Sequence, residues 1–593
     1  MYILGISCHY HDSAACLLKD GEVVCACEEE RLSRIKHDNS FPEKAISFCL
    51  ESAGISPKDL DYVVFYEKPF LKFERIIKTI LSTYPRSFSL FSEVSVNWLK
   101  EKFWIKARIR ECLDIPQERI LFSEHHLSHA ASSFLCSPFR EAAILTCDGV
   151  GEWAATCLGA GHAKWEEAGE NKIDIFEEIR FPHSLGLLYS TFTAFLGFEV
   201  NEGEFKVMGM SSFGQPRYVD KVRELIKSGP DASFELDMRY FSYHYDTRRS
   251  FNRMFEELFG KPRDPASRFV TSGASLYDDN VIPSREELAK NQYYADIAAS
   301  VQQVCSDSLV SIAGELQKKT GLKKLCLSGG VALNCLANSR ILNETSFDEI
   351  FVQPAAGDAG GAMGAALYVW HCLLQKPRKF VLEHAYLGAA FSNSRIERIL
   401  AEKNIAFEYV ADEGKLLSAV VDGLVGQKVI GWFQGRGEWG PRALGNRSIL
   451  ADPRDPRMKD KVNIKIKFRE PFRPFAPAVL QEKAAEYFDL GKSKDQYPLK
   501  FMLYTIGVTK KELIPAVTHV DGSSRIQIVE QSSNPLFYRL ICEFNRRTGV
   551  PVLLNTSFNL KGEPMVHSPE DALATFRASG MDMLIMGNYI VRK

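Results

Sequence analysis

The first thirty residues alternate short apolar runs with polar turns, a pattern typical of β-strands. The runs ILGIS and AACLL are separated by the polar loop CHYHDS, and the run EVVCACE follows directly after Asp20-Gly21. An Asp-Gly pair between two apolar runs is a strong signal for a hairpin turn. We therefore predict a strand, a loop, a second strand, a hairpin turn and a third strand over residues 1–30.

The same plan returns at residues 141–161, in the segment EAAILTCDGVGEWAATCLGAG. An apolar strand leads into an acidic and glycine-containing turn, and a returning strand rich in Ala and Thr follows. Two such hairpins predict a duplicated α/β fold. The actin, hexokinase and heat-shock ATPase superfamily has this layout, with paired hairpin loops that face each other across a phosphate cleft.

Two later segments, KKLCLSGGVALNCLANSRIL and FVQPAAGDAGGAMGAALYVW, follow a strand, glycine turn and helix plan. Each glycine turn is expected to direct backbone N–H groups toward an anion or a nucleotide. Residues 376–378 break the pattern and indicate a linker, after which a new α/β section begins. We therefore predict a first domain over residues 1–380 and a second over residues 381–593.

Length and composition place the chain in the globular class. The 593 residues allow two to four domains, and 45% hydrophobic residues suffice for sizeable cores. The formal net charge is -2, so the whole chain offers no general attraction for nucleic acid or an anionic membrane. The fourteen cysteines form no C-x-x-C pair, and we find no signal peptide and no apolar stretch long enough to span a membrane. We expect reduced thiols, a cytoplasmic location and a small anionic partner.

The segment GRGEWG at residues 435–440 satisfies the G-x-G-x-x-G dinucleotide fingerprint. That fingerprint requires a helix and a second strand, whereas the chain continues through Pro441 into the turn-rich segment ADPRDPRMKD. The region is instead rich in cations interleaved with Phe and Pro. We predict a phosphate-binding site, because guanidinium forks bind phosphate bidentately and glycines let the backbone approach it. Its candidate residues are Arg436, Arg442, Lys467, Arg473, Arg525 and Ser557.

The segment SEHHLSHAASSF contains the strongest candidate for a metal site. On a helix, His125 and His129 share one face, a spacing that presents two imidazoles to one metal. The alternative is a structural pair whose rings bond to the backbone. Asp148, at the end of a predicted strand, and Asp358, at a glycine turn, would complete the ligand set. Two histidines with carboxylates and open positions suit ferrous iron, with zinc or manganese less favoured.

Three further features contain polar, charged or aromatic residues outside these two candidate sites. His11 could be a general base for a hydroxyl group, or the His11-Asp12 pair could serve only to close a turn. Lys36 and His37 follow the charged run EEERLSR, where we expect a solvated charged face. Residues 215–290 are aromatic and charged and indicate either an acceptor-facing insertion or surface helices.

Several motifs together resemble one enzyme family. They are ILGISCHYHDSAACLLKDGEVV, EEERLSRIKHDNSFP, HHLSHAASSF, SGGVALNCLAN, GRGEWGPRALGNRSILADPRDPRMKD and KFREPFRPFAP. The chain resembles, over nearly its whole length, the O-carbamoyltransferases that modify nodulation factors, cephems, ansamycins, aminoglycosides and guanidinium alkaloids. It departs from their pattern at Gly437 and Trp439, where relatives often carry Met and Phe.

The resemblance implies a first domain similar to the tRNA threonylcarbamoyl-transferase fold, within the actin and hexokinase class, and a YrdC-like second domain. The second domain would convert carbamoyl phosphate, by way of carbamate, and ATP with Mg²⁺ into carbamoyl-adenylate and pyrophosphate. The first would transfer the carbamoyl group to a hydroxyl of a small acceptor. A homodimer is compatible with this family.

The resemblance also assigns roles to residues. The metal, Fe²⁺ or another divalent ion, would bind His125, His129, Asp148 and Asp358, and His11 with Asp12 would act as the base. Carbamoyl-adenylate in the first domain would contact Gly329, Gly330, Asn334 and Gly361. ATP and carbamoyl phosphate in the second domain would contact Arg436, Arg442, Lys467, Arg473, Arg525 and Ser557.

Two other functions fit parts of the sequence. An actin-like small-molecule kinase or ATPase would explain the first domain and leave the second without a role. An ATP-switched binding protein, comparable to a heat-shock ATPase, would need an apolar peptide groove in the second domain. The cationic residues there argue against such a groove.

Overall fold

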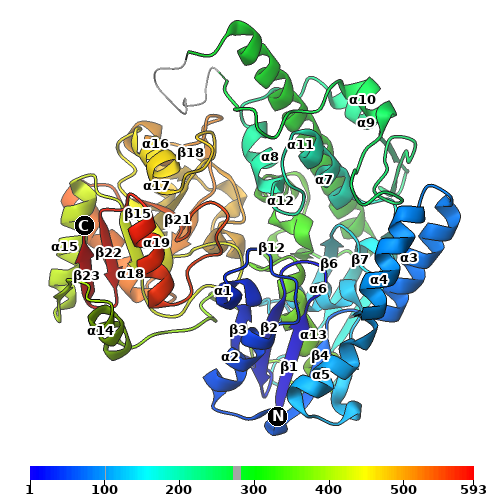
Figure 1. Ribbon diagram of the computed structural model, residues 1–593, viewed down its shortest axis with the longest axis horizontal. Coiled ribbons are helices and arrows are strands. Elements are labelled where there is room, and N and C mark those ends of the chain that lie inside the picture. Colours follow the sequence, from blue (N-terminus) through cyan, green and yellow to red (C-terminus); the bar gives the residue numbers. More distant parts are fainter. Residues whose placement is uncertain (101, 272–281) are drawn as a thin grey trace. The chain divides into compact units, whose positions relative to one another are not determined.

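The computed structural model describes residues 1–100, 102–271 and 282–593, and the chain divides into two compact units (Figure 1). Unit 1 comprises Met1–Glu29, Asn39–Arg268 and Arg285–Leu382. Unit 2 comprises Glu30–Asp38, Phe269–Ser284 and Glu383–Lys593. No helix among the described residues is both long and apolar enough to cross a membrane, and all fourteen cysteines are free thiols.

Unit 1 contains two five-stranded sheets with the same topology. The first has the order β3-β2-β1-β4-β5 and the second the order β12-β11-β6-β7-β8. In each sheet the first three strands form an antiparallel meander, and the other two run parallel to the first. The strands are β1 (Tyr2–Ser7), β2 (Ala14–Lys19), β3 (Glu22–Glu28), β4 (Leu60–Phe65), β5 (Ile120–Phe122), β6 (Glu141–Cys147), β7 (Ala154–His162), β8 (Lys172–Arg180), β11 (Lys324–Ser328) and β12 (Glu349–Val352).

This duplication confirms the predicted duplicated α/β fold of the first unit. Both predicted hairpins are present, with Asp20-Gly21 between β2 and β3 and Asp148 at the start of the β6–β7 turn. The main helices of unit 1 are α2 (Glu43–Ala53), α3 (Pro69–Thr83), α4 (Phe88–Lys100), α5 (Ile105–Leu113), α6 (His125–Phe134), α7 (Leu185–Phe195), α8 (Glu204–Ser211), α9 (Val219–Arg223), α10 (Arg253–Phe259), α11 (Arg285–Thr320), α12 (Cys335–Glu344) and α13 (Asp358–Tyr368).

Glycines bring α13 close to its neighbours in the core. A Cβ atom at Gly364 would lie 1.8 Å from the carbonyl oxygen of Ser128 in α6, and one at Gly5 in β1 would lie 1.8 Å from that of Ala362. No side chain fits at such distances. The small residues of this segment therefore serve helix packing and place α6 and α13, which supply the site residues, side by side.

The expected linker at residues 376–378 is instead part of unit 1. Arg378 is fully buried and donates hydrogen bonds to the carbonyl oxygens of Phe134 (2.8 Å) and Leu135 (3.0 Å) at the end of α6. The prediction was wrong because the sequence does not reveal that these unpaired helix carbonyls require a donor.

The described part of residues 215–290 forms a local aromatic core, and residues 272–281 lie outside the described residues. The rings of Phe255 and Phe259 in α10 each lie 5.1 Å from that of Phe192 in α7. All three side chains are buried. The aromatic residues in this part of the segment thus stabilise its own packing.

Unit 2 is built on one mixed eight-stranded sheet in the order β13-β23-β22-β14-β15-β21-β16-β20. The strands are β13 (Glu408–Tyr409), β14 (Ile430–Phe433), β15 (Arg447–Ala451), β16 (Ala476–Leu480), β20 (Gln527–Val529), β21 (Val552–Ser557), β22 (Met583–Met586) and β23 (Tyr589–Arg592). The main helices are α14 (Asn393–Glu402), α15 (Glu413–Val425), α18 (Pro535–Thr548) and α19 (Pro569–Ala578). The expected α/β character of this unit is confirmed.

Candidate active sites

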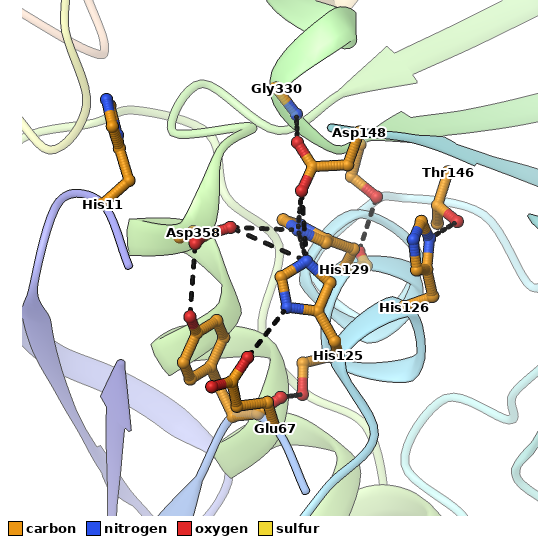
Figure 2. A network of polar contacts seen from close by, with 12 residues as sticks. His11, Glu67, His125, His126, His129, Thr146, Asp148, Gly330 and Asp358 are labelled. Carbon is orange, nitrogen blue, oxygen red and sulfur yellow. Dashed lines mark hydrogen bonds and ion pairs between the residues drawn. The ribbon is translucent and has the colours of Figure 1, made fainter. Parts of the chain in front are cut away.

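Helix α6 begins at His125 and directs two of its three histidines into one cluster (Figure 2). The Nε2 atoms of His125 and His129 are 3.1 Å apart, and both side chains are fully buried. The ring of His126 is turned elsewhere, with Nδ1 2.7 Å from Thr146 Oγ1 and Nε2 2.9 Å from the carbonyl oxygen of Ala154. His126 is therefore a structural histidine, as its position on the helix predicts.

Two aspartates complete the cluster. Asp148 follows β6, and its Oδ2 lies 3.1 Å from His125 Nε2 while its Oδ1 accepts the backbone N–H of Gly330 at 2.9 Å. Asp358, the first residue of α13, places Oδ1 3.5 Å from His129 Nε2. One ligand atom from each of the four residues lies within 4.8 Å of the other three. The structure thus brings together all four predicted metal ligands.

The donor chemistry of this metal cluster, His125, His129, Asp148 and Asp358, fits a divalent cation. Burial alone would lower the pKa of His125, but Asp148, Asp358 and Glu67 raise it to about 10. Burial would likewise raise the pKa of Asp148, and the two histidines hold it well below its usual range. The carboxylates thus create a field that favours positive charge, and imidazole with carboxylate is a common set for iron, zinc or manganese.

A second layer of polar groups surrounds the metal cluster. Tyr66 donates its hydroxyl hydrogen to Asp358 Oδ2 at 3.2 Å, and Glu67 Oε2 lies 3.6 Å from His125 Nδ1. Glu152 accepts the backbone N–H of His125 at 3.0 Å. Our sequence reasoning missed these residues. A signal existed for Glu67, which lies just beyond the apolar strand β4, much as Asp148 lies beyond β6.

His11 is held in the loop between β1 and β2, apart from the metal cluster in Figure 2. Its Nδ1 is 2.6 Å from Asp12 Oδ2, and its Nε2 is 3.0 Å from the carbonyl oxygen of Asn201. Burial alone would lower the pKa of His11, but the hydrogen bond and charge of Asp12 raise it to about 9. Both ring nitrogens face acceptors, so this arrangement favours the imidazolium form.

Only part of the predicted adenylate-binding set borders the metal cluster. Gly329 has a φ of +91°, and a Cβ there would lie 2.2 Å from the carbonyl oxygen of Cys147, so glycine is required. Gly330 binds Asp148, as described above. Asn334 caps α12 and exchanges amide hydrogen bonds with Gln302 at 3.1 Å. Gly361 lies within α13, not in a turn, and packs against Tyr66.

Unit 2 contains a cationic cluster, which we define as the buried residues Lys467 and Arg469 and the half-buried residues Arg473 and Arg525. Lys467 donates to the carbonyl oxygen (2.7 Å) and Oγ (3.0 Å) of Ser557 and to Asn559 Oδ1 (2.9 Å). Burial and the charges of Arg469 and Arg473 hold its pKa well below its usual range. The structure thus brings together the predicted residues Lys467, Arg473 and Ser557.

Arg469 joins the predicted residues of this cluster. Burial is the main cause that lowers the pKa of Arg469, and the charges of Arg473 and Arg525 lower it further. The charge of Glu470 acts in the opposite direction. Arg469 also donates from Nε to Asn463 Oδ1 at 2.6 Å. Buried or half-buried like charges that lower one another's pKa favour an anionic ligand that neutralises them.

The glycine-rich loop at residues 435–446 is held by its own hydrogen bonds. Glu438 Oε1 accepts the backbone N–H groups of Leu444 (2.8 Å), Asn446 (2.9 Å) and Arg447 (3.1 Å). Arg436 donates to the carbonyl oxygens of residues 387 and 388, and Arg442 is half-buried on the same loop. The loop leads into β15, not into a helix, which agrees with the rejection of a dinucleotide fingerprint.

The expectation of a solvated charged face at Lys36 and His37 was wrong, because both residues are half-buried in the segment Glu30–Asp38, which belongs to unit 2. Arg31 is buried and donates to the carbonyl oxygen of Gly440 at 2.7 Å. Arg34 donates to that of Met565 at 2.7 Å. The charge of Lys36 contributes to the lowered pKa of Lys467. These long-range contacts cannot be read from the local charge pattern.

Comparison with known proteins decides the family. Residues 2–367 match the family model described as Carbamoyltransferase N-terminus, and residues 421–593 match Carbamoyltransferase C-terminus. The chain belongs to the carbamoyltransferase family. The resemblance drawn from the sequence motifs is therefore confirmed, and the protein is a carbamoyltransferase enzyme.

Relatives of this carbamoyltransferase include proteins of both known and unknown role. An uncharacterised protein of Synechocystis sp. is 44% identical over 100% of this chain and 97% of its own. Nodulation protein NolNO of Sinorhizobium fredii is 35% identical over 98% of this chain and 79% of its own. The 3'-hydroxymethylcephem-O-carbamoyltransferase of Amycolatopsis lactamdurans is 35% identical over 44% of this chain and 48% of its own.

Proposed function

We propose that this carbamoyltransferase uses ATP and carbamoyl phosphate to carbamoylate a hydroxyl group of a small natural product or sugar, through carbamoyl-adenylate. The observation that carries the proposal is the presence of two clusters of opposite charge in one chain, each with buried charged side chains. The metal cluster of unit 1 suits a cation, and the cationic cluster of unit 2 suits a polyanion. A relative whose name specifies a hydroxymethyl acceptor supports the acceptor class.

In the proposed first reaction, unit 2 makes the mixed anhydride. Water releases phosphate from carbamoyl phosphate, and an oxygen of the resulting carbamate attacks the α-phosphorus of ATP, which arrives with Mg²⁺. A new O–P bond forms and the bond to pyrophosphate breaks. The cationic cluster, with Arg442 and Ser557, would bind the phosphate groups, since fixed guanidinium and ammonium groups stabilise the charge that develops on them. Arg436 would hold the loop through its bonds to the backbone.

In the proposed second reaction, unit 1 transfers the carbamoyl group. The acceptor oxygen attacks the carbonyl carbon, and the C–O bond to AMP breaks. Gly329, Gly330, Asn334 and Gly361 remain proposed contacts for the adenylate. A divalent ion, preferably ferrous iron, held by His125, His129, Asp148 and Asp358 would supply Lewis-acid polarisation of the carbonyl group. Water must be excluded, because the anhydride is readily hydrolysed.

His11 is the proposed general base for the acceptor hydroxyl. To accept a proton at Nε2, the ring must lose its own proton and release the carbonyl oxygen of Asn201. Asp12, bonded to Nδ1, would hold the ring during this change and stabilise the imidazolium that forms.

The test is an assay with ATP, carbamoyl phosphate and a panel of hydroxyl-bearing acceptors. We expect pyrophosphate release that depends on carbamoyl phosphate and an acceptor that gains the mass of one carbamoyl group. Release of ADP with a phosphorylated acceptor would contradict the proposal and favour the small-molecule kinase alternative. Omission of carbamoyl phosphate is the matched control.

A further inference from the structure

Two buried carboxylates lie beneath His125 and hold different parts of it. Glu152 accepts its backbone N–H with both oxygens, at 3.0 and 3.1 Å, and also accepts the backbone N–H of Lys68 at 2.8 Å. Glu67 faces the imidazole, with Oε2 3.6 Å from Nδ1, the ring nitrogen that points away from the metal cluster (Figure 2). Glu152 thus fixes the start of α6, and Glu67 lies next to the imidazole ring of His125.

Glu67 is itself held by a buried cation. Lys72 from α3 donates to Glu67 Oε2 at 2.6 Å, and both residues are only 4% exposed. Lys72 Nζ also lies 5.0 Å from the ring centroid of Tyr10. Removing two charges from water is expensive, so a buried pair of this kind is a poor device for stability alone. The Glu67–Lys72 pair lies directly behind His125, a proposed metal ligand, which indicates a role other than stabilising the fold.

The two histidines of the metal cluster differ in what lies near their Nδ1 atoms. His129 Nδ1 is buried, and among the described residues no hydrogen-bond partner faces it. His125 Nδ1 is also beyond hydrogen-bonding distance of any described partner, but it has the Glu67 carboxylate within 4 Å. Only His125 therefore has the carboxylate neighbour that commonly orients a metal-binding histidine.

We infer that Glu67, held by Lys72, is a positioning residue that orients His125 for metal binding. A proton on Nδ1 directed at Glu67 leaves the lone pair of Nε2 directed at the metal cluster, and the carboxylate increases the basicity of that nitrogen. This inference rests on the proposed metal centre, and it concerns the strength and geometry of binding, not the identity of the reaction.

The experiment compares Co²⁺ binding to the full-length protein and to a Glu67→Met/Lys72→Met double variant. Replacing a buried ion pair by apolar residues of similar volume is often neutral or stabilising, so the double variant is expected to fold. Competition with a chromophoric chelator gives the Kd, and the visible absorption bands of Co²⁺ report the ligand geometry. We expect the Kd to rise by roughly 10- to 100-fold and the bands to change.

Two further variants make the result decisive. Glu124→Gln removes a carboxylate adjacent to His125, but from an exposed pair with Lys68 at 2.7 Å. It should leave both the Kd and the spectrum unchanged. Glu67→Gln/Lys72→Met keeps the shape of the Glu67 side chain without leaving Lys72 buried and unpaired. It serves if the first double variant is unstable, and it should also weaken binding.

The outcomes separate this inference from the function on which it rests. If the wild-type protein binds no Co²⁺ in the metal cluster, both the metal centre and the inference are overturned. If the wild type binds Co²⁺ and a folded Glu67 variant matches its Kd and spectrum, only the inference is overturned. A weaker Kd and altered spectrum for Glu67 variants, with Glu124→Gln unchanged, would support it.

Discussion

The metal cluster of unit 1 is buried and the cationic cluster of unit 2 is centred on two buried residues, Lys467 and Arg469, but the charges of the two clusters are organised in opposite ways. In unit 1, imidazoles and carboxylates alternate, and the carboxylates raise the pKa of His125 to about 10. In unit 2, cations face other cations, and burial with like charges lowers the pKa of Lys467 and Arg469. The field of the first site favours added positive charge, and the field of the second site opposes it.

This contrast shows what each site lacks. A bound cation neutralises a group of ligands with excess negative charge, whereas a polyanion neutralises clustered ammonium and guanidinium groups. One chain therefore carries one cluster whose charge suits a metal ion and another whose charge suits phosphate groups. A reaction that first builds an adenylate and then attacks its carbonyl group requires both. The contrast can be tested by removing one site at a time.

The largest effect is expected for Lys467→Met. This change removes a buried ammonium group from the cationic cluster, so carbamoyl phosphate-dependent pyrophosphate release should fall roughly 10³-fold. A continuous pyrophosphate assay measures it. Lys415→Met removes an exposed lysine of the same unit and should release pyrophosphate at the wild-type rate. Equal rates for the two variants would mean that the cationic cluster does not bind the nucleotide.

Asp148→Asn should weaken metal binding in the metal cluster of unit 1. The change keeps an oxygen for the N–H of Gly330 but removes a charge from the metal cluster, so metal content should fall. Transfer to the acceptor should slow several hundredfold, which corresponds to roughly 3 kcal/mol or more. Elemental analysis and product mass spectrometry measure the two effects. Pyrophosphate release should persist.

The matched control for Asp148→Asn is His126→Gln, on the helix that carries both metal-binding histidines. Among the described residues, the imidazole of His126 bonds to Thr146 and Ala154. This variant should lose thermal stability and keep its metal. Metal loss from His126→Gln and retention in Asp148→Asn would contradict the assignment of ligands.

His11→Asn should slow transfer by about 10²-fold if His11 is the general base. Because the pKa of His11 is about 9 in this arrangement, the neutral base is scarce at pH 7, and the wild-type transfer rate should rise with pH up to about 9. In His11→Asn that rise should disappear. Asp12→Asn removes the group that raises this pKa, so its rising limb should move to lower pH. A wild-type pH profile in His11→Asn would assign the base to another residue.

The smallest effect is expected for Glu438, which organises the loop that leads into β15. Glu438→Ala leaves three buried N–H groups without their acceptor and should cost about 1–3 kcal/mol of unfolding free energy. The KM for ATP should rise about tenfold. Glu438→Gln retains an acceptor oxygen and should lie closer to wild type in urea denaturation and in KM. If Glu438→Ala and Glu438→Gln show the same stability and the same KM, the negative charge of Glu438 matters and its hydrogen bonds do not.

Local patterns predicted much of the fold and of the metal cluster. The β2–β3 hairpin follows from Asp20-Gly21, because the turn depends on the conformation of a few adjacent residues. His125 and His129 follow from helical spacing, and Asp148 follows from its position after an apolar strand. Each of these signals lies within a few residues of the chain.

Features that depend on distant contacts could not be predicted in this way. The glycines around Gly361 suggest an anion-binding turn, but the structure places them inside α13, where they permit close packing. The segment Glu30–Asp38 looks solvated, but its arginines bond to carbonyl groups more than 400 residues away. Glu67 and Lys72 lie outside every motif considered. Their function depends on the pairing of distant segments.

The central claim is that the two units perform separate reactions, and the most direct test supplies the intermediate from outside. Lys467→Met, given synthetic carbamoyl-adenylate and an acceptor, should form carbamoylated product at close to the wild-type rate although it cannot release pyrophosphate. Asp148→Asn under the same conditions should form almost none. If carbamoyl-adenylate fails to restore transfer in a folded Lys467→Met variant, the two reactions are not divided between the units as proposed.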